Sequence, residues 1–261
     1  MFAAYAFIYG LLFGSFFNVL IYRLPEGRSV IFPKSSCPKC NRNLTCLENI
    51  PVLSFLFLRG KCKGCKTKIP LQYPLVELAT GIYSLVLYFV LFDKIEWAAT
   101  GNWWNWIEVF LQYFTLLLFI PIAIIDIKHY IIPDEITITG IVLALAVSFL
   151  PNGITPLQSI IGAAVGGGFL LLVGFIGKII LKKDAMGGGD IKFLFWIGAV
   201  FGFQTALAGI FIGSFVGAVV SGILILLKKI ESENHIPFGP YLCAGVLILV
   251  IFGGIIPNLF Y

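Results

Sequence analysis

Long apolar segments alternate with shorter polar ones along the whole chain. We count eight of them, at 2–22, 71–92, 106–125, 135–150, 157–181, 190–203, 205–227 and 238–259. A helix of about 20 apolar residues crosses the roughly 30 Å hydrocarbon core of a bilayer. The pattern therefore predicts an all-α, polytopic membrane protein with about eight transmembrane helices.

The polar stretch at 23–70 divides the predicted molecule. Residues 1–22 are expected to form a first transmembrane helix, residues 23–70 a cytoplasmic zinc-binding loop, and residues 71–261 a seven-helix core. Within that core the sixth and seventh segments run almost together, and we separate them at Gly202-Phe203-Gln204-Thr205 because their combined length exceeds one span.

Composition agrees with a membrane protein. The chain is 59% hydrophobic and 12% charged, which places it among polytopic membrane proteins and not among soluble domains. The first apolar segment lacks a basic start and a small-residue cleavage site, and Arg23 follows it directly. We therefore expect it to remain in place as a membrane helix.

The positive charges fall on one side of the predicted membrane. With eight spans, 17 of the 18 Lys and Arg residues share one side, and only Lys94 lies on the other. The positive-inside rule puts those loops in the cytoplasm and both termini outside. This placement accounts for the net charge of +5, so no nucleic-acid partner is expected. The opposite loop carries a cluster of tryptophans typical of a membrane interface, namely Trp97, Trp103, Trp104 and Trp106.

Four of the six cysteines form two Cys-x-x-Cys pairs in the first loop, at Cys37/Cys40 and Cys62/Cys65. Two such pairs predict a closed tetrahedral zinc site, which is structural because four thiolates leave no open position for a substrate. An extracytoplasmic disulfide framework is the alternative, but the basic loop indicates the reducing side. Cys46 is a possible competing ligand, although its isolated position favours a free thiol.

Two acids interrupt the apolar pattern. The third segment runs inward and ends at Asp126, and the sixth runs outward from Asp190, which follows Gly187-Gly188-Gly189. Both carboxylates are therefore expected at the cytoplasmic ends of their helices, and the glycines allow another backbone to lie alongside. Two such acids that share a proton can hydrolyse an amide without a covalent intermediate. The alternative is that each acid only ends a helix.

Other polar residues have simpler explanations. Asp134 is predicted to be a helix N-cap, with Glu135 in the first turn. Glu77 lies near the start of the second segment and is either functional or paired with a loop lysine. His129 and His235 lie beside loops, where we expect interfacial roles.

Several short motifs together resemble those of the type IV prepilin peptidases, also called leader peptidases or prepilin N-methyltransferases. Their order and spacing are specific, whereas each alone would be weak. The motifs are Gly14-Ser15-Phe16-Phe17-Asn18-Val19 with Tyr22-Arg23-Leu24-Pro25, Asn49-Ile50-Pro51-Val52-Leu53-Ser54 with Leu58-Arg59-Gly60 between the cysteine pairs, Ile132-Pro133-Asp134 after Asp126, Gly187-Gly188-Gly189-Asp190 and Pro237-Phe238-Gly239-Pro240.

This resemblance implies an intramembrane aspartic peptidase with Asp126 and Asp190 as the catalytic pair. Its substrates would be prepilins or pseudopilins, cut after a glycine at the cytoplasmic face of the bacterial inner membrane. The complete cysteine set resembles that of bifunctional members, which also methylate the new N-terminus with S-adenosylmethionine. The chain lacks a dinucleotide-type glycine fingerprint, so no Rossmann-like methyltransferase domain is expected, and Glu77 and the first loop are the places to look for the methyl-donor site.

Two other classes of function compete with this prediction. A transporter or channel would use the membrane acids to carry protons or ions, but it leaves the glycine triplet and the cysteine loop unexplained. A non-enzymatic component of a pilus or secretion apparatus would bind prepilins without cutting them.

Overall fold

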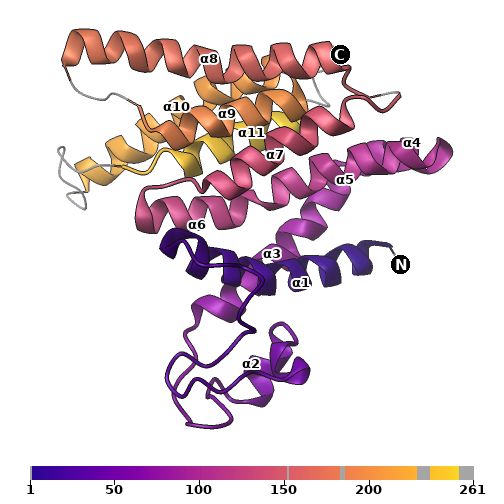
Figure 1. Ribbon diagram of the computed structural model, residues 1–261, viewed down its shortest axis with the longest axis vertical. Helices are drawn as coiled ribbons and strands as arrows, with labels where there is room; N and C mark the ends of the chain where they lie inside the picture. Colours follow the sequence, from indigo (N-terminus) through magenta and orange to yellow (C-terminus); the bar gives the residue numbers. More distant parts are fainter. Residues whose placement is uncertain (1, 152, 183–185, 228–235, 253–261) are drawn as a thin grey trace. The chain divides into compact units, whose positions relative to one another are not determined.

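The computed structural model describes residues 2–151, 153–182, 186–227 and 236–252 (Figure 1). Within these ranges the chain is helical and has no β-strand, as the apolar pattern predicted. Several positions named or counted above lie outside the described residues: Lys183, Lys228, Lys229, His235, residues 253–259 of the last apolar segment, and the side chain of Trp97.

The chain folds as two compact units, Met1–Phe92 and Asp93–Tyr261. In the first, α1 (Phe2–Arg23) packs along α3 (Gln72–Val90). Glycines make this contact close, because a Cβ on Gly14 would lie 2.7 Å from Cα of Glu77, and one on Gly81 would lie 2.8 Å from Leu11. Small residues on both helices therefore allow α1 and α3 to pack closely.

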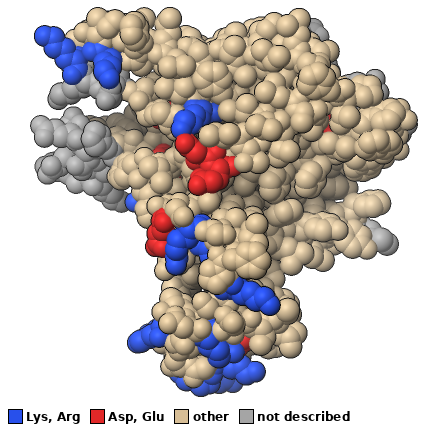
Figure 2. Space-filling model, viewed as in Figure 1, with Lys and Arg blue, Asp and Glu red and all other residues tan. Residues whose placement is uncertain are grey.

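The segment between α1 and α3 forms a small lobe of loops and short helices. Its helical elements are η1 (Leu24–Glu26), η2 (Cys46–Asn49) and α2 (Leu53–Phe57). Figure 2 shows Lys and Arg side chains gathered on this lobe, while the rest of the face in view is largely uncharged. The lobe therefore carries the polar and basic character of the first unit.

The second unit is a bundle of helices. Its elements are α4 (Phe92–Thr100), α5 (Trp103–Leu117), α6 (Phe119–His129), α7 (Asp134–Val147), α8 (Pro156–Leu181), α9 (Gly188–Phe201), α10 (Phe203–Leu226) and α11 (Gly239–Phe252).

Helix α9 lies at the centre of this bundle. It packs against α7, α8 and α10, and Phe193, Leu194 and Ile197 on it are fully buried. Its last turn ends at Gly202, whose φ of 86° is a conformation that favours glycine. The division predicted between the sixth and seventh apolar segments is therefore confirmed at this residue.

Among the described residues, five helical segments are long and apolar enough to cross a membrane: Phe2–Glu26, Gln72–Val90, Trp103–His129, Pro156–Ile180 and Phe203–Leu226. The other three predicted spans correspond to α7, α9 and α11, each of 14 described residues. Fourteen residues of helix extend for only about 21 Å. A polytopic membrane protein is thus supported, and the count of eight spans stays a prediction.

Candidate active site and metal centre

Asp126 and Asp190 lie at the same end of the second unit. Asp126 occupies the last turn of α6, which ends where Tyr130 adopts a left-handed conformation and donates its N–H to the carbonyl of Asp126 at 2.9 Å. Asp190 lies in the first turn of α9. Asp126 is buried, Asp190 is half-buried, and the two carboxylates are close enough to interact electrostatically. The tertiary structure thus brings together the two acids that the topology predicted on one face.

The glycine triplet before Asp190 has two tight positions and one open one. A Cβ on Gly187 would lie 2.9 Å from Oδ2 of Asp190, and one on Gly189 would lie 3.0 Å from Cβ of Ile132. A Cβ on Gly188 would meet no atom within 4 Å. Gly189 therefore lets the start of α9 lie against the segment that follows α6.

A third helix contributes to the acid site through its backbone. Gly239 is the first residue of α11, and its N–H donates a 2.8 Å hydrogen bond to Oδ2 of Asp126. The first N–H groups of a helix have no partner within the helix and favour a negatively charged group. One turn further along α11, the buried thiol of Cys243 lies within electrostatic range of both carboxylates. Sequence reasoning did not foresee these roles of Gly239 and Cys243, although Gly239 lies in one of the recognised motifs.

An ion pair joins two helix starts beside the acids. Nζ of Lys192 on α9 lies 2.6 and 2.7 Å from the two carboxylate oxygens of Asp134 on α7. Asp134 is the first residue of α7, and Pro133 holds the N-cap position, so the prediction of an Asp134 N-cap was wrong by one residue. The rigid Pro133 starts the helix, which leaves the Asp134 side chain available to Lys192.

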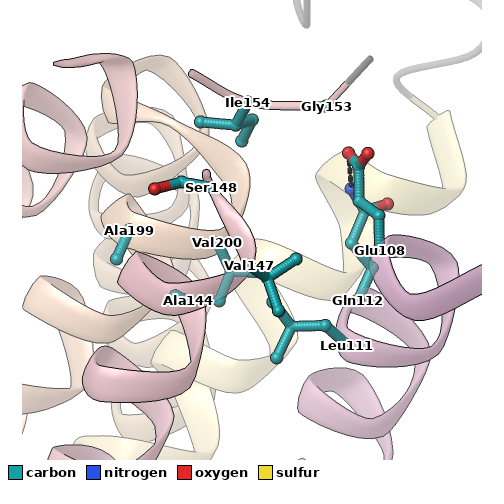
Figure 3. Close-up of a pocket in the computed structure, with 10 residues that line it drawn as sticks. All are labelled: Glu108, Leu111, Gln112, Ala144, Val147, Ser148, Gly153, Ile154, Ala199 and Val200. Atoms are coloured by element: carbon teal, nitrogen blue, oxygen red, sulfur yellow. Dashed lines mark hydrogen bonds between the residues drawn. The ribbon is translucent and has the colours of Figure 1, made fainter. Parts of the chain in front are cut away.

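A pocket lies at the other ends of α5, α7 and α9, near Ser148 and Ala199 (Figure 3). Two of its polar side chains bond to each other, since Gln112 Nε2 donates to Glu108 at 3.2 Å, and Gln112 also accepts a hydrogen bond from Lys94 at 2.8 Å. Glu108 and Asp126 are separated by roughly 27 Å of helix at 1.5 Å per residue. This pocket is therefore not part of the acid site.

The four paired cysteines come together in the lobe of the first unit. The Sγ atoms of Cys37, Cys40, Cys62 and Cys65 all lie within 4.8 Å of one another, and those of Cys37 and Cys65 are 3.8 Å apart. Two sulfurs at ~2.3 Å from a tetrahedral zinc would be about 3.8 Å apart. All four are free thiols, as is Cys46, which is exposed and outside the cluster. The donor set and its spacing therefore fit a metal ion.

The metal centre is built from two equivalent turns. In each turn, the backbone N–H of the first cysteine donates to the carbonyl of the residue five positions later. The carbonyl of the same cysteine accepts the N–H of the residue four positions later, and all of these distances are 2.8 to 3.0 Å. The residue after the second cysteine has a positive φ, and an isolated β-bridge closes the turn. The corresponding residues are Ser36 and Lys61, Cys37 and Cys62, Cys40 and Cys65, Asn41 and Lys66, Arg42 and Thr67, and Asn43 and Lys68. The two turns therefore form a repeat, in which each residue of the second turn lies 25 positions after its counterpart in the first, as Cys62 does after Cys37.

Neighbouring groups lower the pKa values of two cysteines in this cluster. The Thr67 hydroxyl, 3.3 Å from Sγ of Cys65, together with the Thr67 backbone lowers the pKa of Cys65 to about 6. Backbone N–H groups of Cys65 and Gly64 lower the pKa of Cys62. These contacts favour the thiolate forms of Cys62 and Cys65, which are the forms that bind a metal.

Glu77, the other acid singled out in the sequence, lies in the first unit on α3. Its side chain accepts a 2.7 Å hydrogen bond from the N–H of Val52, and the residue is only 8% exposed. Every lysine of the first loop is described, and none of them forms an ion pair with Glu77. The alternative of a loop-lysine partner is therefore wrong.

Comparison with known proteins identifies the family. Residues 8–91 match the model of the bacterial peptidase A24 N-terminal domain, and residues 113–222 match that of the type IV leader peptidase family. No solved structure gave a significant match.

Curated relatives match over most of the chain. Proteins named prepilin leader peptidase/N-methyltransferase from Aeromonas salmonicida and Neisseria gonorrhoeae are 32% and 35% identical to it, over 95% and 94% of this chain and 89% and 88% of their own lengths. One of the same name from Pseudomonas aeruginosa is 32% identical over 94% of this chain. These matches confirm the resemblance seen in the motifs and give no support to the transporter alternative. The chain belongs to the type IV leader peptidase family.

Proposed function

We propose that this protein is an intramembrane aspartic endopeptidase that removes the short basic leader of prepilins or pseudopilins after a glycine, and then N-methylates the new terminus. The observation that carries the peptidase part is the convergence of Asp126, Asp190 and the N-terminus of α11 at one end of the second unit. Membership of a peptidase family supports the same conclusion.

In the proposed reaction Asp126 acts as the base. It already accepts the N–H of Gly239, and such a bond is strongest when the acceptor carries charge. Asp126 takes a proton from a water molecule, which attacks the scissile carbonyl, while protonated Asp190 donates a hydrogen bond to the carbonyl oxygen. Collapse of the tetrahedral intermediate breaks the C–N bond, and the leaving amine takes the proton from Asp126. Because two interacting acids titrate together, any apparent pKa belongs to the pair.

The metal of the cysteine cluster is proposed to be zinc with a structural role. Cys37, Cys40, Cys62 and Cys65 would hold it with thiolates, and this leaves no position open for a substrate. The metal would stabilise a lobe that has little apolar core of its own.

The methyl donor is proposed to be S-adenosylmethionine, whose sulfonium supplies an electrophilic methyl group when bound. The names of the relatives support a second, methyl-transferring activity. A buried polar acceptor that lacks a donor in the first unit, Oδ1 of Asn18, is consistent with a cationic ligand there.

We place the protein in the bacterial inner membrane, with the basic loops and the acid site facing the cytoplasm. The bias of Lys and Arg toward one set of loops supports this orientation. Its partners are then prepilin or pseudopilin substrates and the surrounding lipid, with no nucleic acid.

The test is incubation of the purified full-length protein, in proteoliposomes, with a prepilin and S-adenosylmethionine, followed by intact-mass measurement of the product. Loss of the leader demonstrates the peptidase, and a further methyl group demonstrates the transferase. Asp126→Asn and Asp190→Asn are each expected to reduce leader cleavage by about 10²- to 10⁴-fold without unfolding the protein.

Asp93→Asn is the matched control, since it changes an acid of the second unit far in sequence from both active-site helices. A chain that binds the prepilin but never cuts it would support the non-enzymatic assembly component. Ion uptake that depends on both acids, without a peptide product, would support the transporter. Full processing by either active-site variant would refute the acid pair.

A further inference from the structure

The first unit holds a buried polar pair that peptide hydrolysis does not use. Asn18 on α1 and Glu77 on α3 are 4% and 8% exposed, although both helices are long enough and apolar enough to cross a membrane. Polar and ionisable residues in such helices are costly and mark functional sites by default. This pair is therefore a candidate functional site of the first unit.

The orientation of the Asn18 amide is defined by its contacts. Its Nδ2 donates to the carbonyl of Gly14 at 3.2 Å and to that of Tyr73 at 3.1 Å. Because both contacts need the NH₂ group, the amide cannot be rotated to exchange its O and N. Oδ1 is left buried without a hydrogen-bond donor. Unsatisfied buried acceptors are rare in folded proteins, so this atom points to an absent donor.

Glu77 places a carboxyl group at the same end of the helix pair. A helical side chain leans toward the N-terminus of its helix, so that of Glu77 extends toward Tyr73, whose carbonyl binds Asn18. One carboxylate oxygen accepts the N–H of Val52, and the Ser15 hydroxyl lies beside the carboxyl group. No described Lys or Arg forms an ion pair with it.

The loop contact that covers Glu77 is itself unusual. Val52 has a φ of 60° and a ψ of −49°, a positive-φ conformation that is strained for a β-branched residue. Strain of this kind is maintained only where the surroundings require it, and it clusters at ligand sites. Here it directs the backbone N–H of Val52 to the Glu77 carboxylate.

An acceptor oxygen and a carboxylate without a cationic partner are complementary to a cation that carries hydrogen-bond donors. We propose that Asn18 and Glu77 bind the methyl donor, with Asn18 Oδ1 accepting from its ammonium group and Glu77 offsetting its positive charge. This assignment deepens the proposed methyltransferase function and depends on it. In the transfer, the amine of the cleaved substrate forms an N–CH₃ bond and loses a proton, and the S–CH₃ bond breaks to give a neutral thioether.

That loss of charge makes the role of Glu77 testable by direct binding. Labelled S-adenosylmethionine and S-adenosylhomocysteine are measured by equilibrium dialysis against the full-length protein without peptide. Glu77→Gln is expected to weaken binding of the sulfonium by about tenfold or more, and binding of the neutral thioether by less than about threefold. Asn18→Leu removes the acceptor oxygen. It is expected to weaken binding of both ligands, because both carry the ammonium group.

Glu26→Gln is the control, since Glu26 is an acid of the same unit whose side chain is 49% exposed. Leader cleavage, which depends on the second unit, and metal content report whether each variant is folded. Equal losses of both ligands in Glu77→Gln would show a structural role and overturn the assignment, as would unchanged sulfonium binding. A wild-type protein that binds no sulfonium would overturn the proposed methyltransferase function as well.

If the site instead selects the ammonium of the cleaved substrate, Glu77→Gln will weaken binding of the leaderless peptide and leave binding of S-adenosylmethionine unchanged. That result would also overturn the assignment to the methyl donor.

Discussion

The backbone N–H of Gly239 donates a 2.8 Å hydrogen bond to Oδ2 of Asp126, across 113 residues of sequence. The contact is possible because residue 239 has no side chain, since a Cβ there would lie 2.8 Å from the same oxygen. The first turn of α11 is thereby tied to the acid at the end of α6. We expect this contact to hold the Asp126 carboxylate in its reactive orientation.

Gly239→Ala is therefore expected to reduce leader cleavage by about 10- to 100-fold, because a displacement of about 1 Å at a reacting group costs that much. The measurement is kcat and KM on a prepilin in proteoliposomes, and the loss is expected in kcat. Gly222→Ala is the matched control, since a Cβ at this glycine of α10 would meet nothing within 4 Å. Equal activity of the two variants would contradict the role of the contact.

The three glycines before Asp190 are expected to differ in their tolerance of a methyl group. Gly187→Ala places a Cβ against the Asp190 carboxylate, and Gly189→Ala places one against Ile132, so each should reduce cleavage by about tenfold or more. Gly188→Ala meets no atom within 4 Å and should retain most of the activity. Initial rates of the three variants, at matched levels of folded protein, test this order. A Gly188→Ala variant as inactive as the other two would disprove it.

The ion pair between Lys192 and Asp134 is expected to matter more for activity than for stability. Both side chains are about half exposed, at 42% and 54%, and exposed pairs contribute at most about 1 kcal/mol to folding. Asp134→Lys should lower kcat, because Lys192 lies two residues from Asp190 and the pair anchors the start of α9. The charge exchange Asp134→Lys with Lys192→Asp should restore part of the rate. A double variant that is no better than the single one would exclude this role.

Metal content gives a direct test of the cysteine cluster. Elemental analysis is expected to find about one zinc per chain. Cys37→Ser with Cys62→Ser should remove that metal, because it takes one ligand from each of the two equivalent turns. Cys46→Ser is the control and should retain the metal, since Cys46 lies outside the cluster. Zinc that remains at wild-type levels in the double variant would exclude these ligands.

Glu48 makes a contribution to the stability of the lobe that depends on pH in the acid range. The hydrogen bond from Arg42, at 2.6 Å, with those from Thr45, lowers the pKa of Glu48 to about 2. A carboxyl whose pKa is lower in the folded state contributes its full stability above its unfolded pKa of about 4.3, and that contribution is lost as the pH falls toward the folded value. Between pH 6 and pH 8 the contribution is therefore constant.

Glu48→Gln should accordingly increase proteolysis of the lobe by the same factor at pH 6 and at pH 8, measured as the rate of cleavage within residues 23–70. Glu26→Gln is the control, since Glu26 belongs to an exposed pair with Arg28. An effect of Glu48→Gln that disappears at pH 6 would show that its pKa is not lowered in this way.

Much of this molecule could be predicted from local features of the chain. Each of the eight apolar segments corresponds to a helical stretch among the described residues, because burial of apolar side chains follows residue type and helical period. The spacing of Cys37, Cys40, Cys62 and Cys65 predicted their cluster, since two residues between cysteines suit one tight turn. The approximate meeting of Asp126 and Asp190 followed from topology alone.

Only the tertiary structure decided which polar groups meet. The bonds of Gly239 to Asp126, of Lys192 to Asp134 and of Val52 to Glu77 join residues that are 113, 58 and 25 positions apart. Each of them depends on how distant helices and loops pack, and no local propensity specifies that. The chain by itself determined which segments are buried and which residues carry the chemistry. Packing determined which donors and acceptors meet, and it left the buried acceptor on Asn18 without a donor.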